Sequence, residues 1–164
     1  MARIDDRMLD VNQHGVLRIP AGVWLAFIFM ARHWLMVLVV TVSARRNQDA
    51  VRLYGHDFNW GLLMLEVPAV LLLWLCTRRH PEAGRLVRAL WPHARQLAMA
   101  TALLHIAYVA WYLWQSSYWL PWPELYLASC ALIDVAIIHA LYTSAHLKQV
   151  FSEFPEPQTE RPVP

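Results

Sequence analysis

One arginine, Arg32, lies near the middle of the apolar run Ala21–Val42, with no charged residue for ten positions on either side. A guanidinium group keeps its charge under physiological conditions, so it cannot become neutral in order to enter hydrocarbon. Insertion scales put the cost of an arginine at the centre of a membrane helix at roughly 2.5–3.5 kcal/mol. Arg32 therefore needs a partner inside the folded protein.

Three further apolar runs follow, Asn59–Thr77, Ala94–Gln115 and Trp122–Thr143. Each of the four runs is long enough to cross about 30 Å of hydrocarbon as an α-helix. Apolar residues make up 58% of the chain and charged residues only 16%. The apolar content is higher and the charged content lower than in soluble proteins, as expected for a membrane protein. The sequence predicts an all-α, polytopic membrane protein, a four-transmembrane-helix bundle that forms one domain over residues 1–154.

The basic residues are unevenly divided between the two sides of such a bundle. Ten basic residues would lie on the side of the termini and the second loop: Arg3, Arg7, Arg18, Arg78, Arg79, Arg85, Arg88, Arg95, Lys148 and Arg161. Only three would lie on the other side, in the first loop: Arg45, Arg46 and Arg52. The positive-inside rule then predicts both termini in the cytoplasm of a bacterium, with the chain in its inner membrane. The expected partners are the lipid bilayer and other membrane proteins or further copies of the chain, and no nucleic acid.

Two segments outside the apolar runs have a distinct composition. Residues 82–92 place apolar side chains on one helical face, which predicts a short helix on anionic lipid, or alternatively a solvated loop that only sets topology. Those side chains are Leu86, Val87, Leu90 and Trp91. Residues 155–164 are polar and rich in proline, which predicts a disordered tail.

Each predicted span brings an ionisable group to the middle third of the membrane. Counted from the predicted boundaries, these groups are Arg32, His33, Glu66, His105, Asp134 and, nearer the cytoplasm, His139. We expect Arg32 to pair with Asp134, because their depths match and a contact between the first and last spans closes a bundle. Pairing with Glu66, alone or together with Asp134, is the alternative. Such a pair serves structure or function, and a structural role is favoured.

Glu66 stands two residues before Pro68, which predicts a helix kink and frees the carbonyl of Met64. Burial favours the neutral form of a carboxyl group. In that form, Glu66 would donate a hydrogen bond to the freed carbonyl, and the kink would satisfy its own polar groups.

Other polar residues, His139 among them, are expected to be buried in the bundle. Thr101, His105, Tyr108 and Tyr112 follow one another at helical spacing and share a face.

Two histidines at similar depth, His33 and His105, also raise the possibility of a bis-histidine haem. Hydrogen-bonded core histidines are the favoured interpretation, since the chain carries no cofactor fingerprint and no zinc spacing. No cofactor, no metal and no catalytic residue are therefore expected.

Several stretches along the chain are similar to one known family. They are His14–Pro20 with Trp24, Ala31–Trp34, Phe58 with Gly61–Leu62 and Pro68–Ala69, Leu132–Asp134, and Val150–Pro155. They resemble the YfeZ-like family of uncharacterised bacterial inner-membrane proteins, over nearly the whole chain. The resemblance implies location and topology, and no activity. It also implies a small residue, often glycine, near the position of Glu66, which leaves Arg32 with Asp134 as the favoured pair.

The expected function is that of a non-enzymatic integral membrane protein, an accessory or assembly subunit of a larger complex. The first alternative is a small transporter or proton-coupled carrier that works as an oligomer, because four helices alone rarely enclose a pathway. The second alternative is a haem-binding membrane protein.

Overall fold

The computed structural model describes residues 16–44, 60–115 and 121–155. These residues fold mainly into helices, and no β-strand occurs among them, which confirms the predicted all-α class. The first loop, most of the third loop and most of the C-terminal tail lie outside the described residues, so the basic residues of the first loop and the predicted disorder of the tail fall there.

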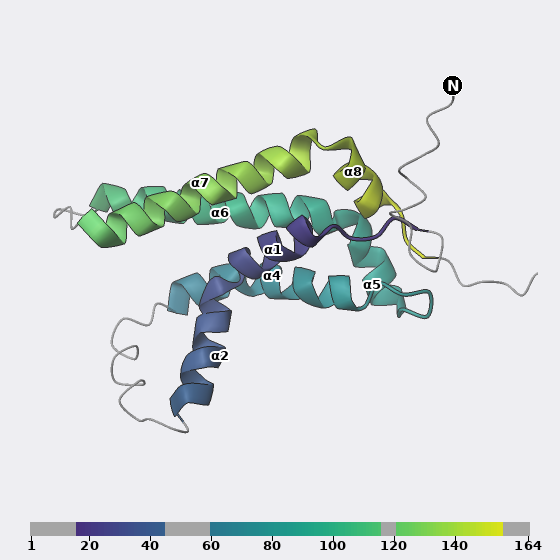
Figure 1. Cartoon of the computed structure of the whole chain (residues 1–164), viewed down its shortest axis with the longest axis horizontal. Helices are drawn as coiled ribbons and strands as arrows, with labels where there is room; N and C mark the ends of the chain where they lie inside the picture. Colours follow the sequence, from purple (N-terminus) through teal and green to yellow (C-terminus); the bar gives the residue numbers. More distant parts are fainter. Residues whose placement is uncertain (1–15, 45–59, 116–120, 156–164) are drawn as a thin grey trace, which may run out of the picture.

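Three long helices form the body of the molecule, and two of them, α6 and α7, lie side by side over most of their length (Figure 1). They are α4 (Trp60–Thr77), α6 (Ala94–Gln115) and α7 (Pro121–Thr143). Each has an apolar stretch long enough to cross a membrane, as the apolar runs predicted. The protein thus has three candidate spans among its described residues, or four if the bent pair described next counts as one.

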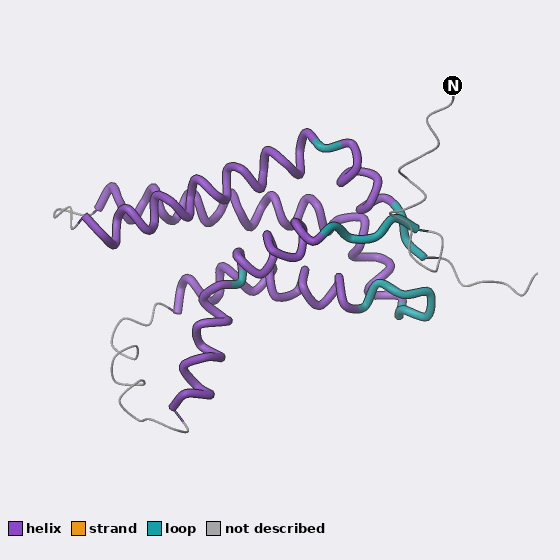
Figure 2. The backbone as a smooth tube through the Cα atoms, in the orientation of Figure 1, coloured by secondary structure: helices purple, strands orange, loops and turns teal. Residues whose placement is uncertain are grey.

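The first apolar run does not form one straight helix, and the prediction of a continuous helix over Ala21–Val42 is wrong at Ala31. The chain forms α1 (Ala21–Met30) and α2 (Arg32–Ala44), which meet at an angle of 71°. Ala31 lies between them with non-helical torsion angles, φ −98° and ψ 19°. Helix α1 lies along α4, whereas α2 turns away from the body of the molecule (Figures 1 and 2).

Arg79 joins three distant parts of the chain at the end of the molecule where α8 (Ala145–Ser152) lies (Figure 1). Its guanidinium donates to the carbonyl of Leu17 at 2.7 Å, of Glu153 at 2.9 Å and of Val150 at 3.3 Å. Burial lowers the pKa of the Arg79 guanidinium, and the nearby Glu153 carboxylate opposes that shift. Arg79 is therefore a structural clasp that ties the N-terminal segment, the second loop and the C-terminal segment together.

The segment predicted to form an interfacial helix contains α5 (Arg85–Leu90), followed by the short 3₁₀ helix η2 (Trp91–His93), which leads directly into α6. Its apolar side chains are divided between two environments. Val87 and Trp91 are buried, and the Trp91 ring lies 5.4 Å from that of Phe151 in α8, while Leu86 is exposed. This part of the predicted lipid-facing side therefore packs against protein.

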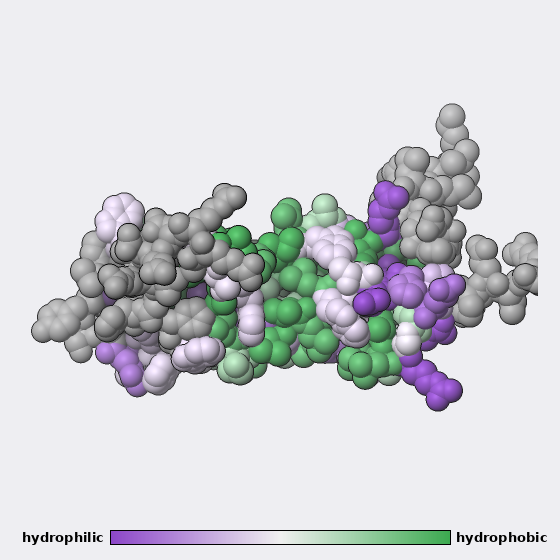
Figure 3. All heavy atoms as spheres, turned by 90° about the horizontal axis from the view of Figure 1, so that it is seen from below, coloured by the Kyte–Doolittle hydropathy of each residue, from purple (hydrophilic) through white to green (hydrophobic). Residues whose placement is uncertain are grey.

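The outside of the molecule is apolar along its middle, and hydrophilic residues gather toward the end where α5 and α8 lie (Figure 3). Large exposed apolar side chains include Leu103, Leu104, Leu125, Leu132 and Val135. Such a wide apolar surface is a liability in water and the normal exterior of a protein in lipid.

Candidate functional site

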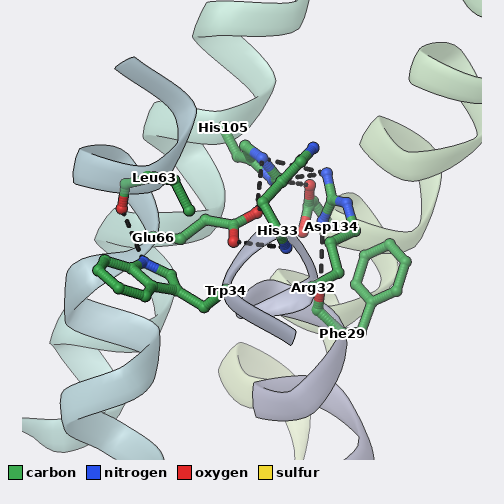
Figure 4. A network of polar contacts seen from close by, with 8 residues as sticks. All are labelled: Phe29, Arg32, His33, Trp34, Leu63, Glu66, His105 and Asp134. Carbon is green, nitrogen blue, oxygen red and sulfur yellow. Dashed lines mark hydrogen bonds and ion pairs between the residues drawn. The ribbon is translucent and has the colours of Figure 1, made fainter. Parts of the chain in front are cut away.

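Five ionisable side chains from four helices meet beside the break between α1 and α2 (Figure 4). They are Arg32 and His33 from α2, Glu66 from α4, His105 from α6 and Asp134 from α7. We call these five residues the buried cluster. Glu66 and Asp134 have no exposed surface and His105 is almost fully buried, whereas Arg32 and His33 at the edge of the cluster are half-buried.

Glu66 caps the start of α2. One carboxylate oxygen, Oε2, accepts a hydrogen bond from the backbone N–H of His33 at 2.9 Å, and the other, Oε1, lies 2.5 Å from Nδ1 of the same residue. The first N–H groups of a helix have no partner within the helix, and the positive end of the helix dipole favours an anion there. The break in the first span is thus satisfied by a carboxylate from a neighbouring helix.

Arg32 has the opposite role at the end of α1. Its Nη1 donates to the carbonyl of Phe29 at 3.2 Å, and its guanidinium lies 4.6 Å from the centre of the Phe29 ring. A cation is favoured at a helix C-terminus, where carbonyl groups lack partners. Each side of the break therefore carries a charge of the sign that its helix end prefers.

The other guanidinium nitrogen of Arg32, Nη2, lies 3.0 Å from Nε2 and 3.2 Å from Nδ1 of His105. A donor in line with one ring nitrogen would be much farther from the other. Near-equal distances therefore place the guanidinium against the face of the imidazole, where the lone pair of neither ring nitrogen is directed at it.

His105 is oriented by Asp134, whose Oδ2 lies 2.9 Å from Nδ1 of the ring. A carboxylate accepts hydrogen bonds, so Nδ1 carries a proton and donates it to this contact. Nε2 of His105 then lies on the Glu66 side of the ring, 3.7 Å from Oε1 of that residue. Glu66 and Asp134 are thereby linked through one imidazole.

The predicted direct pair between Arg32 and Asp134 is wrong, as is direct pairing with Glu66. Among the described residues, no ion pair joins Arg32 to either carboxylate, and both Arg32 and Asp134 contact His105 instead. The bend at Ala31 directs Arg32 toward the end of α1 and the His105 ring. Nε of Arg32 and Oδ1 of Asp134 are buried without a hydrogen-bond partner in the described part of the chain.

The predicted bond from Glu66 to the carbonyl of Met64 is also replaced, since both Glu66 oxygens face His33. Pro68 does lie inside α4, and the helix continues through it from Trp60 to Thr77. Five residues before Pro68, the carbonyl of Leu63 accepts a hydrogen bond from the indole of Trp34 at 2.9 Å. This bond holds the start of α2 against α4.

The remaining predicted polar residues do not join the buried cluster. His139 is exposed on α7, so its expected burial is wrong. Tyr108 is half-buried, with its ring 5.9 Å from that of Trp111, and Tyr112 is exposed. Of the polar side chains predicted to line α6, only Thr101 and His105 are buried.

The ring centres of the two cluster imidazoles are 6.4 Å apart and their planes are nearly perpendicular, but a carboxylate occupies the space between them. Oε1 of Glu66 lies between them, 2.5 Å from Nδ1 of His33 and 3.7 Å from Nε2 of His105. A porphyrin would have to displace that carboxylate and its bond to the backbone of α2.

The apolar exterior, the long helices and the enclosed ionisable cluster define an α-helical membrane protein. The chain belongs to the family described as protein of unknown function (DUF2919), whose model matches residues 7–153. It is similar to the inner membrane protein YfeZ of Escherichia coli (strain K12), with 29% identity over 149 residues, covering 88% of this chain and 93% of that protein. No solved structure matches it. The resemblance inferred from the sequence is confirmed.

Proposed function

We propose that the protein is a multi-pass inner-membrane protein with four spans and both termini in the cytoplasm. The clasp at Arg79 supports this orientation, because it gathers the N-terminal segment, the second loop and the C-terminal segment at one end of the molecule. The described basic residues near that end include Arg18, Arg78, Arg85, Arg88 and Lys148. A concentration of arginine and lysine is typical of the cytoplasmic side. The inner-membrane relative supports the location.

Within that topology, we propose that the protein is a small cation carrier and has no enzymatic activity. The observation that carries this proposal is the position of the break, which lies directly at the buried cluster. Secondary transporters commonly bind ions and substrates near the membrane midplane, where a span is interrupted. Ionisable residues inside a membrane bundle are also the residues that most often serve transport.

The sign of the cargo follows from the charges. One guanidinium and two carboxylates give the buried cluster a formal charge of −1, with histidine counted as neutral. An unbalanced charge in a low-dielectric site is costly, and a bound cation lowers that cost. The cluster therefore favours a positively charged ligand over an anion.

An oligomeric form would supply the walls of a pathway that four helices rarely enclose. Helix α2 offers a surface for this, because it leaves the body of the molecule with an exposed apolar face. That face comprises Leu35, Met36, Leu38, Val39 and Val42. The same surface supports the second candidate function, an accessory subunit whose α2 contacts another membrane protein.

Flux measurements in proteoliposomes test the carrier. The purified full chain is reconstituted, and fluxes of Na⁺, K⁺, Mn²⁺ and Zn²⁺ are followed separately. We expect a flux of at least one cation that Asp134→Asn abolishes while the protein remains folded. His139→Ala is the matched control on the same helix, because His139 is exposed and outside the cluster. A folded, reconstituted protein that moves none of these ions would overturn the carrier.

Cross-linking separates the oligomer from the accessory subunit. Val39→Cys on α2 should yield a cross-linked product in membranes, and Leu132→Cys on α7 is the comparison at an apolar position that is also highly exposed. A product of two identical chains supports the oligomer. A product with one defined second protein, recovered reproducibly by native purification and mass spectrometry, supports the accessory role. Recovery of only a free monomer counts against both.

A further inference from the structure

We infer that His33, Glu66 and His105 form a binding site for a divalent transition-metal ion of the zinc or cobalt type, with Asp134 as the residue that orients His105. This inference deepens the proposed function by naming the class of cation, and it rests on that function for the claim that the buried cluster holds a cation. The sequence pattern predicted no metal, because the three ligands come from three separate helices with no local spacing motif.

The ligand atoms already lie close together. His33, Glu66 and His105 each offer one nitrogen or oxygen atom, and these three atoms lie within 4.8 Å of one another. Ligands of a tetrahedral zinc ion, bound at about 2.0–2.1 Å, lie roughly 3.4 Å apart. The separation of 3.7 Å between Oε1 of Glu66 and Nε2 of His105 is near that value. The 2.5 Å contact between Glu66 and His33 would lengthen as the metal enters.

Asp134 gives the second, independent observation. Histidines that bind metals usually donate their other ring N–H to a carboxylate, which fixes the tautomer and the orientation of the ring. His105 has this arrangement, since its Nδ1 donates to Oδ2 of Asp134 at 2.9 Å. The remaining ring nitrogen, Nε2, is then a lone-pair donor directed toward the side where Glu66 lies. Asp134 thus leaves His105 with one unprotonated ring nitrogen, as a metal ligand requires.

The donor set selects the metal class. Two imidazoles and one carboxylate suit zinc, cobalt, nickel or iron, whereas magnesium and calcium prefer oxygen ligands. Three protein ligands also leave a fourth position open, unlike the closed sites that hold structural zinc. An open position permits exchange of ligands, which a carried ion requires and a structural ion does not.

Arg32 tunes the affinity of this site. Its guanidinium lies against the His105 ring, where it repels a bound cation without occupying the lone pair of Nε2. Metal binding should therefore be weaker than the ligand set alone would give, which favours release. Arg32→Gln removes this repulsion, and we expect it to tighten binding by about ten-fold. Arg32→Lys keeps the charge and should leave the affinity nearly unchanged.

Equilibrium titration tests the site without any need for transport. The purified full chain, with its affinity tag removed, is titrated with Co²⁺, whose visible absorption reports tetrahedral coordination by nitrogen and oxygen. Competition with Zn²⁺ then gives the zinc affinity. We expect one Co²⁺ per chain, displaced by Zn²⁺. His105→Ala and Glu66→Ala should abolish this signal, and Asp134→Asn should weaken binding by about 10–100-fold.

The matched control is His139→Ala, which should bind Co²⁺ as the wild-type chain does. Absence of Co²⁺ and Zn²⁺ binding by the folded wild-type chain, or binding that survives His105→Ala, would overturn the metal site. Flux of Na⁺ or K⁺ without metal binding would overturn this inference and leave the carrier standing. Metal binding without any flux would overturn the carrier and leave the metal site standing. A gain of affinity in Arg32→Gln cannot arise if the cluster is only a hydrogen-bonded core.

Discussion

Nδ1 of His105 lies 2.9 Å from Oδ2 of Asp134, and this contact stands where the sequence predicted an arginine–carboxylate pair. The imidazole contacts both the guanidinium of Arg32 and the carboxylate of Asp134, and it links helices α6 and α7 beside the break. Arg32 is used instead at the end of α1, through the carbonyl of Phe29. The buried cluster is therefore organised around His105 and not around an ion pair between the first and last spans.

A charge reversal tests this arrangement. The double variant Arg32→Asp with Asp134→Arg should fold no better than the single variants, because no ion pair joins the two side chains. Arg32 contacts the Phe29 carbonyl and the face of the His105 ring, whereas Asp134 accepts a hydrogen bond from Nδ1 of that ring. The measurement is the yield of monodisperse protein after detergent extraction. Rescue of the single variants by the double variant would mean that the two residues pair directly.

Coupling energies extend the same test. We expect His105→Ala and Asp134→Ala to be coupled by about 1–3 kcal/mol in a double-mutant cycle, since they share a buried hydrogen bond. Arg32→Ala with Asp134→Ala should show a smaller coupling energy. Thermal or denaturant unfolding in one detergent gives all the values, and the reverse order of the two couplings would contradict the structure.

Removal of the Glu66 cap should loosen α2. Glu66→Ala leaves the His33 N–H without its acceptor in a buried site, and we expect a loss of about 2–4 kcal/mol in the free energy of unfolding. Glu66→Gln keeps one acceptor oxygen and should lose roughly half as much. Glu82→Ala is the control, because Glu82 is exposed. Equal losses for the alanine and glutamine variants would show that charge, and not the capping bond, is what matters.

Arg79 and Arg78 make a matched pair of neighbours. Arg79→Met leaves three backbone carbonyls without their buried donor, and we expect a loss of about 3–5 kcal/mol. Arg79→Lys should lie in between, because a lysine cannot reproduce the guanidinium fork. Arg78→Met should change stability by no more than about 0.5 kcal/mol, since Arg78 is exposed. Similar losses at both positions would contradict the clasp.

The purified protein should be colourless. Oε1 of Glu66 lies between the His33 and His105 rings, so iron protoporphyrin added to the folded chain should not produce a bis-histidine spectrum. The measurement is the absorption in the Soret region, before and after addition of haem. A sharp Soret band that is lost in His105→Ala would restore the haem-binding alternative.

The membership of the buried cluster follows largely from depth. Arg32, His33, Glu66, His105 and Asp134 stand at similar distances from the ends of the apolar runs, and all five meet. His139 lies outside the cluster because it stands five residues after Asp134, which at about 100° per residue turns it to another side of α7.

The contacts between the residues of the buried cluster could not be predicted, and the reason lies in the local sequence around the break. The residues around the break, Phe29 to Trp34, contain neither glycine nor proline, so the sequence carries no signal for the bend at Ala31. A straight helix would direct Arg32 elsewhere. The same limit applies to Arg79, which is identical in type to its neighbour Arg78 and differs from it only in direction at the end of α4.

The sequence by itself determined that the chain belongs in a lipid bilayer, that it is helical, and how deep in its span each ionisable group lies. These properties follow from the length and polarity of continuous segments. It also determined that Arg32 must have partners inside the protein. Only the tertiary structure decided which partners those are. Several acceptors lie at one depth and each would offset the cost of burying a guanidinium, so the choice depends on the bend at Ala31 and on the rotation of four helices.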